Sequence, residues 1–192
     1  MDICSVILAG GESSRMGTNK ALLKLNNEIV IEKIFNELQQ LSSRVYIVAN
    51  EKKIYDFLNI PIISDRFYGK GPLAGIETAL YHAAEDVIVI SPCDTPFIHK
   101  EIYRYLVDEL KTYDAVIPYY DNQPQPLSGI YKKRILPIIQ EQLQNDELRI
   151  RSFFSKINVK YVHDFGHISD LIIEKHFFNM NDPEAYSRAK TY

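Results

Sequence analysis

The strongest constraint on the fold is a regular alternation of strand-like and helix-like patterns over the first two thirds of the chain. Apolar runs of strand length occur at Ile3 to Leu8, Arg44 to Ala49 and Val87 to Ile90. Residues 28–41 and 72–83 carry apolar side chains at helical spacing. Strands that alternate with helices over short connections build right-handed βαβ units. The pattern therefore predicts a three-layer α/β/α arrangement, with a mainly parallel sheet and helices on both faces.

Weaker patterns fill the rest of the chain. Pro61 places a short strand at 60–64 near an edge of the sheet. We also expect helices at 52–58, 102–110, 135–143 and 150–156, strands at 115–117, 127–131 and 160–163, and a C-terminal helix from Asp182. We find no internal repeat, linker or low-complexity tract, and therefore expect one domain over residues 1–192.

Composition excludes several classes of function. Hydrophobic residues make up 46% and charged residues 24% of the chain, ordinary values for a globular protein, and a net charge of −3 argues against nucleic acid as the main partner. Cys4 and Cys93 form no CxxC motif or disulfide framework, which fits a reducing compartment. We see neither a secretory signal nor an apolar stretch long enough to span a membrane. We therefore expect a cytoplasmic protein with no nucleic acid and no membrane as partner.

The loop after the first strand has the residue types of an anion-binding site. Gly10 and Gly11 are adjacent, Gly17 follows, and the loop carries Arg15 and Lys20. Glycines allow successive backbone N–H groups to converge on an anion, and the two cations add charge and directional donors. The spacing fits neither a P-loop nor a dinucleotide fingerprint. The alternative is an ordinary tight turn, but the residues suit phosphate.

Two carboxylates follow other predicted strands. Asp65 ends the strand at 60–64. Asp94 follows the strand at 87–90 and lies between Pro92 and Pro96 in the sequence. Ligands of open α/β sheets bind beyond the carboxyl ends of the strands, where these residues and the glycine loop would meet. Each Asp could instead be a turn former or a helix cap. A rigidly aimed Asp94 that faces a phosphate loop predicts a magnesium site.

These motifs, taken in order, resemble those of MobA-like nucleotidyltransferases. The resemblance extends over essentially the whole chain, and its later motifs are similar to those of molybdenum cofactor guanylyltransferases. It rests on Leu8-Ala9-Gly10-Gly11-x-Ser13-x-Arg15-Met16-Gly17-x-x-Lys20, on Gly71-Pro72-Leu73-Ala74-Gly75-Ile76, on Cys93-Asp94-Thr95-Pro96-Phe97, on Gln125-Pro126-Leu127 and on Phe178-Asn179-Met180-Asn181-Asp182-Pro183-Glu184.

The resemblance implies a Rossmann-like nucleotidyltransferase fold, GTP and the molybdopterin cofactor as substrates, and Mg2+ as cofactor. The product would pass to cofactor-insertion proteins or apo-molybdoenzymes. By the family pattern Arg15, Lys20 and Asp94 act in catalysis, and Asp94 also binds the metal. The nucleotide would be held by Leu8, Ala9, Gly10, Gly11, Lys20, Asp65 and Asp94, and the pterin substrate by Gln125, Asn179 and Asn181.

Two alternatives stay open at this point. One is a cytidylyltransferase or another small-molecule nucleotidyltransferase of the same fold, and the other is a non-catalytic protein that binds and delivers the cofactor. The third loop residue is Gly10 rather than Ala, and by the resemblance this leans toward guanine. The presence of both Lys20 and Asp94 favours an enzyme over a delivery protein.

A few residues depart from the family pattern or lie outside it. Asn19 precedes the loop lysine where the family often has Asp, so one acidic group is missing. Asp182 stands where the family usually has Thr, and both residues cap helices well. His163 and His167 are four residues apart, but no Glu or Cys stands beside them at zinc-like spacing, so we interpret them as surface or loop residues.

Overall fold

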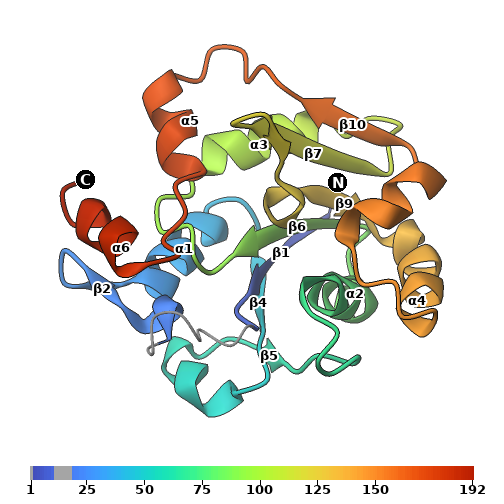
Figure 1. Cartoon of the computed structure of the whole chain (residues 1–192), viewed down its shortest axis with the longest axis horizontal. Helices are drawn as coiled ribbons and strands as arrows, with labels where there is room; N and C mark the ends of the chain where they lie inside the picture. Colours follow the sequence, from blue (N-terminus) through green and yellow to red (C-terminus); the bar gives the residue numbers. More distant parts are fainter. Residues whose placement is uncertain (1, 11–18) are drawn as a thin grey trace.

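A twisted sheet forms the middle of the computed structural model, which describes residues 2–10 and 19–192 (Figure 1). Its strands lie in the order β10-β7-β9-β6-β1-β4-β5, and β8 pairs with β7 at one side. The strands are β1 (Ile3–Leu8), β4 (Arg44–Val48), β5 (Ile62–Ile63), β6 (Val87–Pro92), β7 (Ala115–Tyr120), β8 (Gln123–Pro124), β9 (Ile130–Lys132) and β10 (Val159–Val162). A separate hairpin consists of β2 (Lys24–Leu25) and β3 (Glu28–Ile29).

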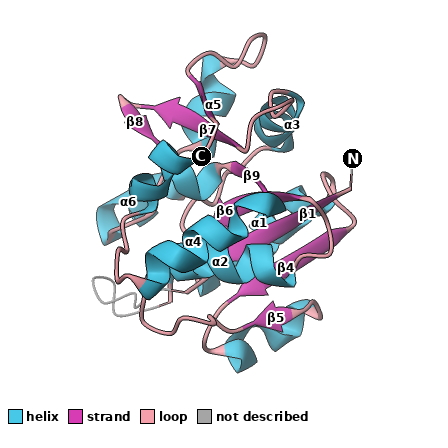
Figure 2. Ribbon diagram, turned by 90° about the vertical axis from the view of Figure 1, so that its right-hand side faces the viewer, coloured by secondary structure: helices cyan, strands magenta, loops and turns pink. Residues whose placement is uncertain are grey.

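Helices cover both faces of this sheet (Figures 1 and 2). They are α1 (Val30–Gln39), α2 (Pro72–His82), α3 (Lys100–Asp108), α4 (Leu136–Gln144), α5 (Asp170–His176) and α6 (Pro183–Ala189). One apolar core lies between the sheet and α1, α3 and the C-terminal helices, and a second lies under α2 and α4. Strand β1 supplies both cores, because its successive side chains point to opposite faces: Val6 packs under α2 and Ile7 under α1.

The pairing confirms the predicted fold class. Strand β1 runs parallel to both β4 and β6, β5 is parallel to β4, and β7 is parallel to β10. Strand β9 is antiparallel to both of its neighbours, β6 and β7. The sheet is therefore mainly parallel but mixed, and the expectation that the strand at 60–64 lies at an edge is also confirmed.

The predicted strand at 127–131 is wrong in its first half. A 3-10 helix occupies Pro126–Ser128, and β9 begins only at Ile130. Proline has no N–H for a ladder, and the Tyr131 hydroxyl donates to the Pro126 carbonyl oxygen at 2.6 Å, which holds the turn against the strand. The short helices expected at 52–58 and 150–156 are 3-10 helices as well.

The helix expected at 28–41 begins two residues later than its pattern suggests. Glu28 and Ile29 pair with the strand before them through a two-residue turn, in which Asn26 and Asn27 have φ angles of 51° and 67°. Positive φ at both positions is the geometry of a tight hairpin, and Asn tolerates it. Helix α5 was not predicted, because seven residues are too few to show a helical period clearly.

Among the residues described, no helix is long and apolar enough to cross a membrane.

The parallel strands determine where a site can form. Strands β1, β4, β5 and β6 run in the same direction, so their carboxyl ends lie along one edge of the sheet. The residues that follow these ends are Ala9, Ala49, Ser64 and Cys93. This edge is therefore the place to look for a ligand site.

Candidate functional site

A cleft of about 380 Å3 opens at the carboxyl edge of the sheet. Its walls come from the segments after β1, β5 and β6, from the start of α2, from the turn before β9 and from the chain after α5. The volume lies in the range of small-molecule sites. Nearly all the binding residues predicted from the sequence and described by the structure line this cleft: Leu8, Ala9, Gly10, Lys20, Asp65, Asp94, Gln125 and Asn179.

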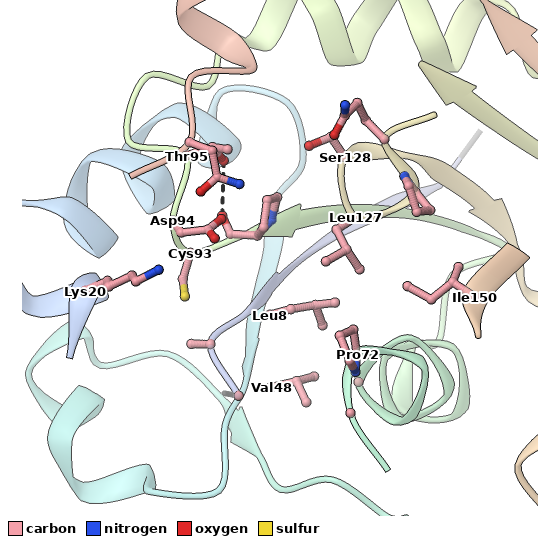
Figure 3. Close-up of a pocket in the computed structure, with 18 of the residues that line it drawn as sticks. Leu8, Lys20, Val48, Pro72, Cys93, Asp94, Thr95, Leu127, Ser128 and Ile150 are labelled. Atoms are coloured by element: carbon pink, nitrogen blue, oxygen red, sulfur yellow. Dashed lines mark hydrogen bonds between the residues drawn. The ribbon is translucent and has the colours of Figure 1, made fainter. Parts of the chain in front are cut away.

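The cleft has an apolar part and a polar part (Figure 3). Leu8, Val48, Pro72, Leu127 and Ile150 form the apolar wall, and the figure shows them gathered between β1 and α2. The Lys20 side chain extends from the other side toward Cys93 and Asp94. An apolar wall with a few convergent polar groups is typical of sites for small organic ligands that carry charge at one end.

Asp94 lies in the polar part, four residues after the end of the predicted strand. Its backbone is fixed on both sides, since the Cys93 N–H donates to the Leu8 carbonyl at 3.2 Å and the Asp94 carbonyl accepts from Met180 N–H at 2.8 Å. Burial raises the pKa of the Asp94 carboxyl, and the nearby charge of Lys20 and the Asn179 side chain partly offset this rise. Among the residues described, its Oδ1 atom is buried and has no hydrogen-bond partner.

The Asp94 carboxylate fits a hard divalent cation. Such a cation takes oxygen ligands, and Mg2+ commonly binds through one or two carboxylates together with substrate phosphates and water. Within residues 2–10 and 19–192, no group of three or more His, Cys, Asp or Glu side chains could hold a metal alone. Asp94 would thus hold a cation that a phosphate-bearing substrate helps to bind, and its unpartnered oxygen is free for that purpose.

Lys20 begins a short 3-10 helix, Lys20–Leu22, whose N-cap is Asn19. The Asn19 Oδ1 atom accepts from Ala21 N–H at 3.0 Å, and its Nδ2 atom donates to the Tyr55 hydroxyl at 3.0 Å. Asn19 thus fixes the start of the 3-10 helix that carries Lys20, because its oxygen caps the helix and its amide binds Tyr55. The Lys20 ammonium donates to Asn181 Oδ1 at 2.8 Å.

Asp65, which follows β5, also lines the cleft and is half-buried. Its Oδ2 atom accepts from Asn50 Nδ2 at 3.0 Å, and its N–H donates to Asn50 Oδ1 at 3.1 Å. Burial raises the pKa of the Asp65 carboxyl, and the bond from Asn50 partly offsets the rise. The backbone of Gly10 passes close to the Asp65 carboxylate, since a Cβ atom at this position would lie 3.5 Å from Oδ2, an ordinary van der Waals distance.

Sequence reasoning missed Asn50. It follows β4 as Asp94 follows β6, at the carboxyl edge of the sheet. Its position after a predicted strand was therefore a usable signal, but Asn is also an ordinary turn residue.

An ion pair with a buried carboxylate and a partly exposed guanidinium fixes the chain that follows Asp65. The Arg66 guanidinium donates to Glu77, a fully buried carboxylate of α2, and Gln140 Nε2 donates to the same oxygen at 2.8 Å. The Arg66 N–H donates to Thr78 Oγ1 at 3.0 Å. The guanidinium also lies over the Tyr81 ring, 3.3 Å from its centroid. The loop is thus attached to α2 at several points.

The three residues predicted for the pterin side differ in what they contact. Gln125 and Asn179 line the cleft, whereas Asn181 contacts the Lys20 ammonium. The Gln125 side chain donates to the Tyr120 carbonyl at 3.3 Å, which fixes the turn before β9. The predicted roles of all three residues stay predictions.

Two predicted residues, Gly11 and Arg15, lie outside the described residues. His163 packs against the Tyr119 ring at 4.4 Å between centroids, and neither it nor His167 lines the cleft. This agrees with the interpretation of both histidines as surface or loop residues, since their side chains are exposed.

A family model described as "MobA-like NTP transferase domain" matches residues 5–161. A protein of Carboxydothermus hydrogenoformans named "Probable molybdenum cofactor guanylyltransferase" is 40% identical over 182 residues, which cover 95% of this chain and 92% of that protein. A protein of the same name from Clostridium perfringens is 34% identical over 95% of this chain and 93% of its own length.

The chain is also similar to a solved structure over nearly its whole length. The crystal structure of molybdopterin-guanine dinucleotide biosynthesis protein A from Archaeoglobus fulgidus is 25% identical and superposes with a TM-score of 0.83. The match covers 98% of this chain and 97% of that one. It therefore includes the sheet, both helical layers and the C-terminal segment.

Proposed function

The chain belongs to the family of MobA-like NTP transferases, and we propose that it is a molybdenum cofactor guanylyltransferase. It would transfer GMP from GTP to the terminal phosphate of molybdopterin and release pyrophosphate. The observation that carries this proposal is the agreement between relatives of that name over nearly the whole chain and a cleft that brings Lys20, Asp65 and Asp94 to one edge of the sheet.

The reaction needs positioning and charge neutralisation more than acid–base chemistry. The terminal phosphate of molybdopterin is already an anion, so no general base has to generate the nucleophile. The difficulty is to bring two polyanions together in line at the α-phosphorus of GTP. Lys20 would neutralise charge on the triphosphate, and Arg15 is proposed to do the same. No side chain of the cleft needs to form a covalent intermediate.

Asp94 is the proposed ligand of a divalent cation, Mg2+ in our proposal. When bound, such a cation would supply positive charge that stabilises the charge developing on the departing pyrophosphate, and Asp94 is the residue that would hold it. Asp94 contributes a carboxylate whose direction is set by the hydrogen bonds of Cys93 and Met180. The backbone between two prolines limits its movement, so the carboxylate is ready before the substrate arrives.

Asp65 and Asn50 would bind the nucleoside part of GTP. Asp65 has one carboxylate oxygen without a hydrogen-bond partner among the described residues, and Asn50 holds the other. Nucleosides present N–H and O–H donors on the base and the ribose, and a carboxylate accepts from either. The apolar wall of Leu8 and Pro72 would pack against the flat base.

We propose one domain over residues 1–192, because the two apolar cores share the strands of a single sheet. The proposed partners that receive the product are cofactor-insertion proteins or apo-molybdoenzymes.

The test is to incubate the protein with molybdopterin, Mg2+ and each nucleoside triphosphate in turn, and to measure pyrophosphate and the dinucleotide product. We expect release with GTP, dependent on molybdopterin. Release with CTP instead would identify a cytidylyltransferase, and binding of molybdopterin without release from any nucleotide would identify a delivery protein. Either result would contradict the proposal.

A further inference from the structure

The segment between α5 and α6 contacts two charged residues of the cleft, Lys20 and Asp94. Met180 is its anchor: its side chain is fully buried, and its N–H donates to the Asp94 carbonyl at 2.8 Å. On one side of Met180, the Asn179 side chain lies near the Asp94 carboxylate and contributes to its pKa. On the other side, Asn181 accepts from the Lys20 ammonium at 2.8 Å. Three consecutive residues thus contact Asp94 and Lys20: Met180 binds the Asp94 backbone, and the side chains of Asn179 and Asn181 lie against the two charged groups.

Helix α6 fixes this segment from its other end. Asp182 caps the helix, since its Oδ1 atom accepts from Ala185 N–H at 2.7 Å. Farther along the helix, the Tyr186 hydroxyl donates to the Lys24 carbonyl at 2.9 Å. Figure 1 shows α6 beside the hairpin that contains β2. The Asn181 contact with Lys20 and the Tyr186 contact with Lys24 therefore both link the C-terminal segment to residues 20–24.

Charge alone would favour a different arrangement of Lys20. Burial raises the pKa of the Asp94 carboxyl, and the ammonium is close enough to offset part of that rise. It donates its hydrogen bond to the Asn181 side chain, while Asp94 Oδ1 has no partner among the residues described. A direct ion pair between Lys20 and Asp94 would occupy both groups, and a phosphate and a cation would each have to break it.

We propose that Asn181 is a positioning residue of the nucleotide half of the site. Its side-chain oxygen holds the Lys20 ammonium away from the Asp94 carboxylate, so that the lysine stays available to a phosphate and the carboxylate to a divalent cation. This inference rests on the proposed function, and it assigns Asn181 to GTP rather than to the pterin side that the sequence suggested.

The two assignments of Asn181 differ in a measurable way. A residue that acts through Lys20 affects binding of the nucleotide when no pterin substrate is present. A residue that only contacts the pterin substrate leaves that binding unchanged and raises the KM of molybdopterin. Calorimetric titration of the protein with Mg2+ and GTP, in the absence of molybdopterin, therefore separates them.

The variant Asn181→Leu removes the acceptor and keeps the size of the side chain. We expect the Kd of GTP in the presence of Mg2+ to rise about tenfold, the order of a lost hydrogen bond to a charged group. We also expect a severalfold rise in the Mg2+ concentration that gives half-maximal binding. Asn36→Ala is the control, because Asn36 is exposed on α1 and lies outside the cleft.

A double variant tests whether Asn181 acts through the lysine. In the background of Lys20→Ala, the change Asn181→Leu should have no further effect on the Kd of GTP. An effect as large as in the native background would overturn the proposal, as would a native Kd of GTP for Asn181→Leu with a raised KM of molybdopterin. If the native protein itself fails to bind GTP, the proposed function fails, and this outcome is distinct from both. Unfolding temperatures of all variants show that they fold.

Discussion

Asn50 and Asp65 form a reciprocal pair across two parallel strands, with the Asn50 amide donating to Asp65 Oδ2 at 3.0 Å and Asp65 N–H donating to Asn50 Oδ1 at 3.1 Å. The pairing follows from the register of the sheet. Val48 of β4 lies beside Ile63 of β5, so the residues two positions beyond each, Asn50 and Asp65, face each other past the last ladder bond. The strand pairing thus brings the amide to the carboxylate.

We expect Asn50→Ala to weaken nucleotide binding more than it affects folding. The side chain is exposed, so the loss of stability should be about 1 kcal/mol. Asp65 would lose the partner of both its carboxylate and its N–H, and the Kd of GTP should rise about tenfold. Titration with GTP and thermal unfolding measure the two effects. A native Kd would show that Asp65 holds its position without Asn50.

Asp94→Asn should abolish turnover and leave the fold at least as stable. The substitution removes the proposed cation ligand but keeps the shape of the side chain. Burial raises the pKa of Asp94, which means that the folded state disfavours its ionised form. A neutral side chain removes this cost, so the unfolding temperature should stay the same or rise. Pyrophosphate release and thermal unfolding are the measurements.

The matched control is Asp86→Asn, an exposed aspartate of the turn before β6. It should change neither turnover nor the unfolding temperature. Chelation of divalent cations should stop turnover of the native protein, and added Mg2+ should restore it. Turnover by Asp94→Asn at the native rate would contradict the assignment of Asp94 to the cation.

His176 gives the fold a pH dependence that can be tested separately from activity. Burial lowers the pKa of His176 to about 3, and the neighbouring His99 contributes to the shift. Its Nδ1 atom accepts from His99 N–H at 2.9 Å, and the rings of Tyr103 and Phe177 pack on it. The unfolded chain takes up this proton near pH 6.5 and the folded chain does not. Stability is therefore full above about pH 6.5 and falls as the pH drops toward 3.

Between pH 8 and pH 5 the free energy of unfolding should fall by about 2 kcal/mol from this group. In His176→Asn the side-chain oxygen can take the place of Nδ1, and most of that fall should disappear, although the smaller side chain lowers stability at every pH. His167→Asn, at an exposed position, should keep the native dependence. Urea unfolding at several pH values gives the free energy of unfolding of each protein. An equal dependence of this free energy on pH in all three proteins would contradict the role of His176.

The fold was predictable where residues are buried on both faces of the sheet. The first four residues of β6, Val87 to Ile90, are all apolar because helices cover the strand on both sides, and such a run is visible in the sequence. The start of strand β9 was harder to predict, because the turn at Pro126–Ser128 depends on a hydrogen bond from Tyr131 that no local pattern reveals. Helix α5 is held by its buried end, His176, which packs among aromatic rings from other elements.

The site was predictable as a set of strand ends but not as a set of contacts. Asp65, Asp94 and the glycine loop follow strands, and the topology rule for parallel sheets places them together. The contact of Asn181 with Lys20 joins residues 161 positions apart. Spacing cannot indicate such a contact, and the resemblance suggested the pterin side instead. Asn50 likewise gains its meaning only from the register of β4 with β5.

Glu77 should be the more important of two glutamates for stability. It is fully buried in α2, and it accepts from the Arg66 guanidinium and from Gln140 Nε2. Glu77→Ala would leave Arg66 and Gln140 without their acceptor and open a cavity under the loop that carries Asp65. The expected loss is about 3 kcal/mol, the order found when one partner of a buried ion pair is removed. Glu141→Ala breaks an exposed pair with Lys156 and should cost less than about 1 kcal/mol. Urea unfolding of both variants measures the difference, and equal losses would show that burial of Glu77 contributes nothing beyond a surface pair.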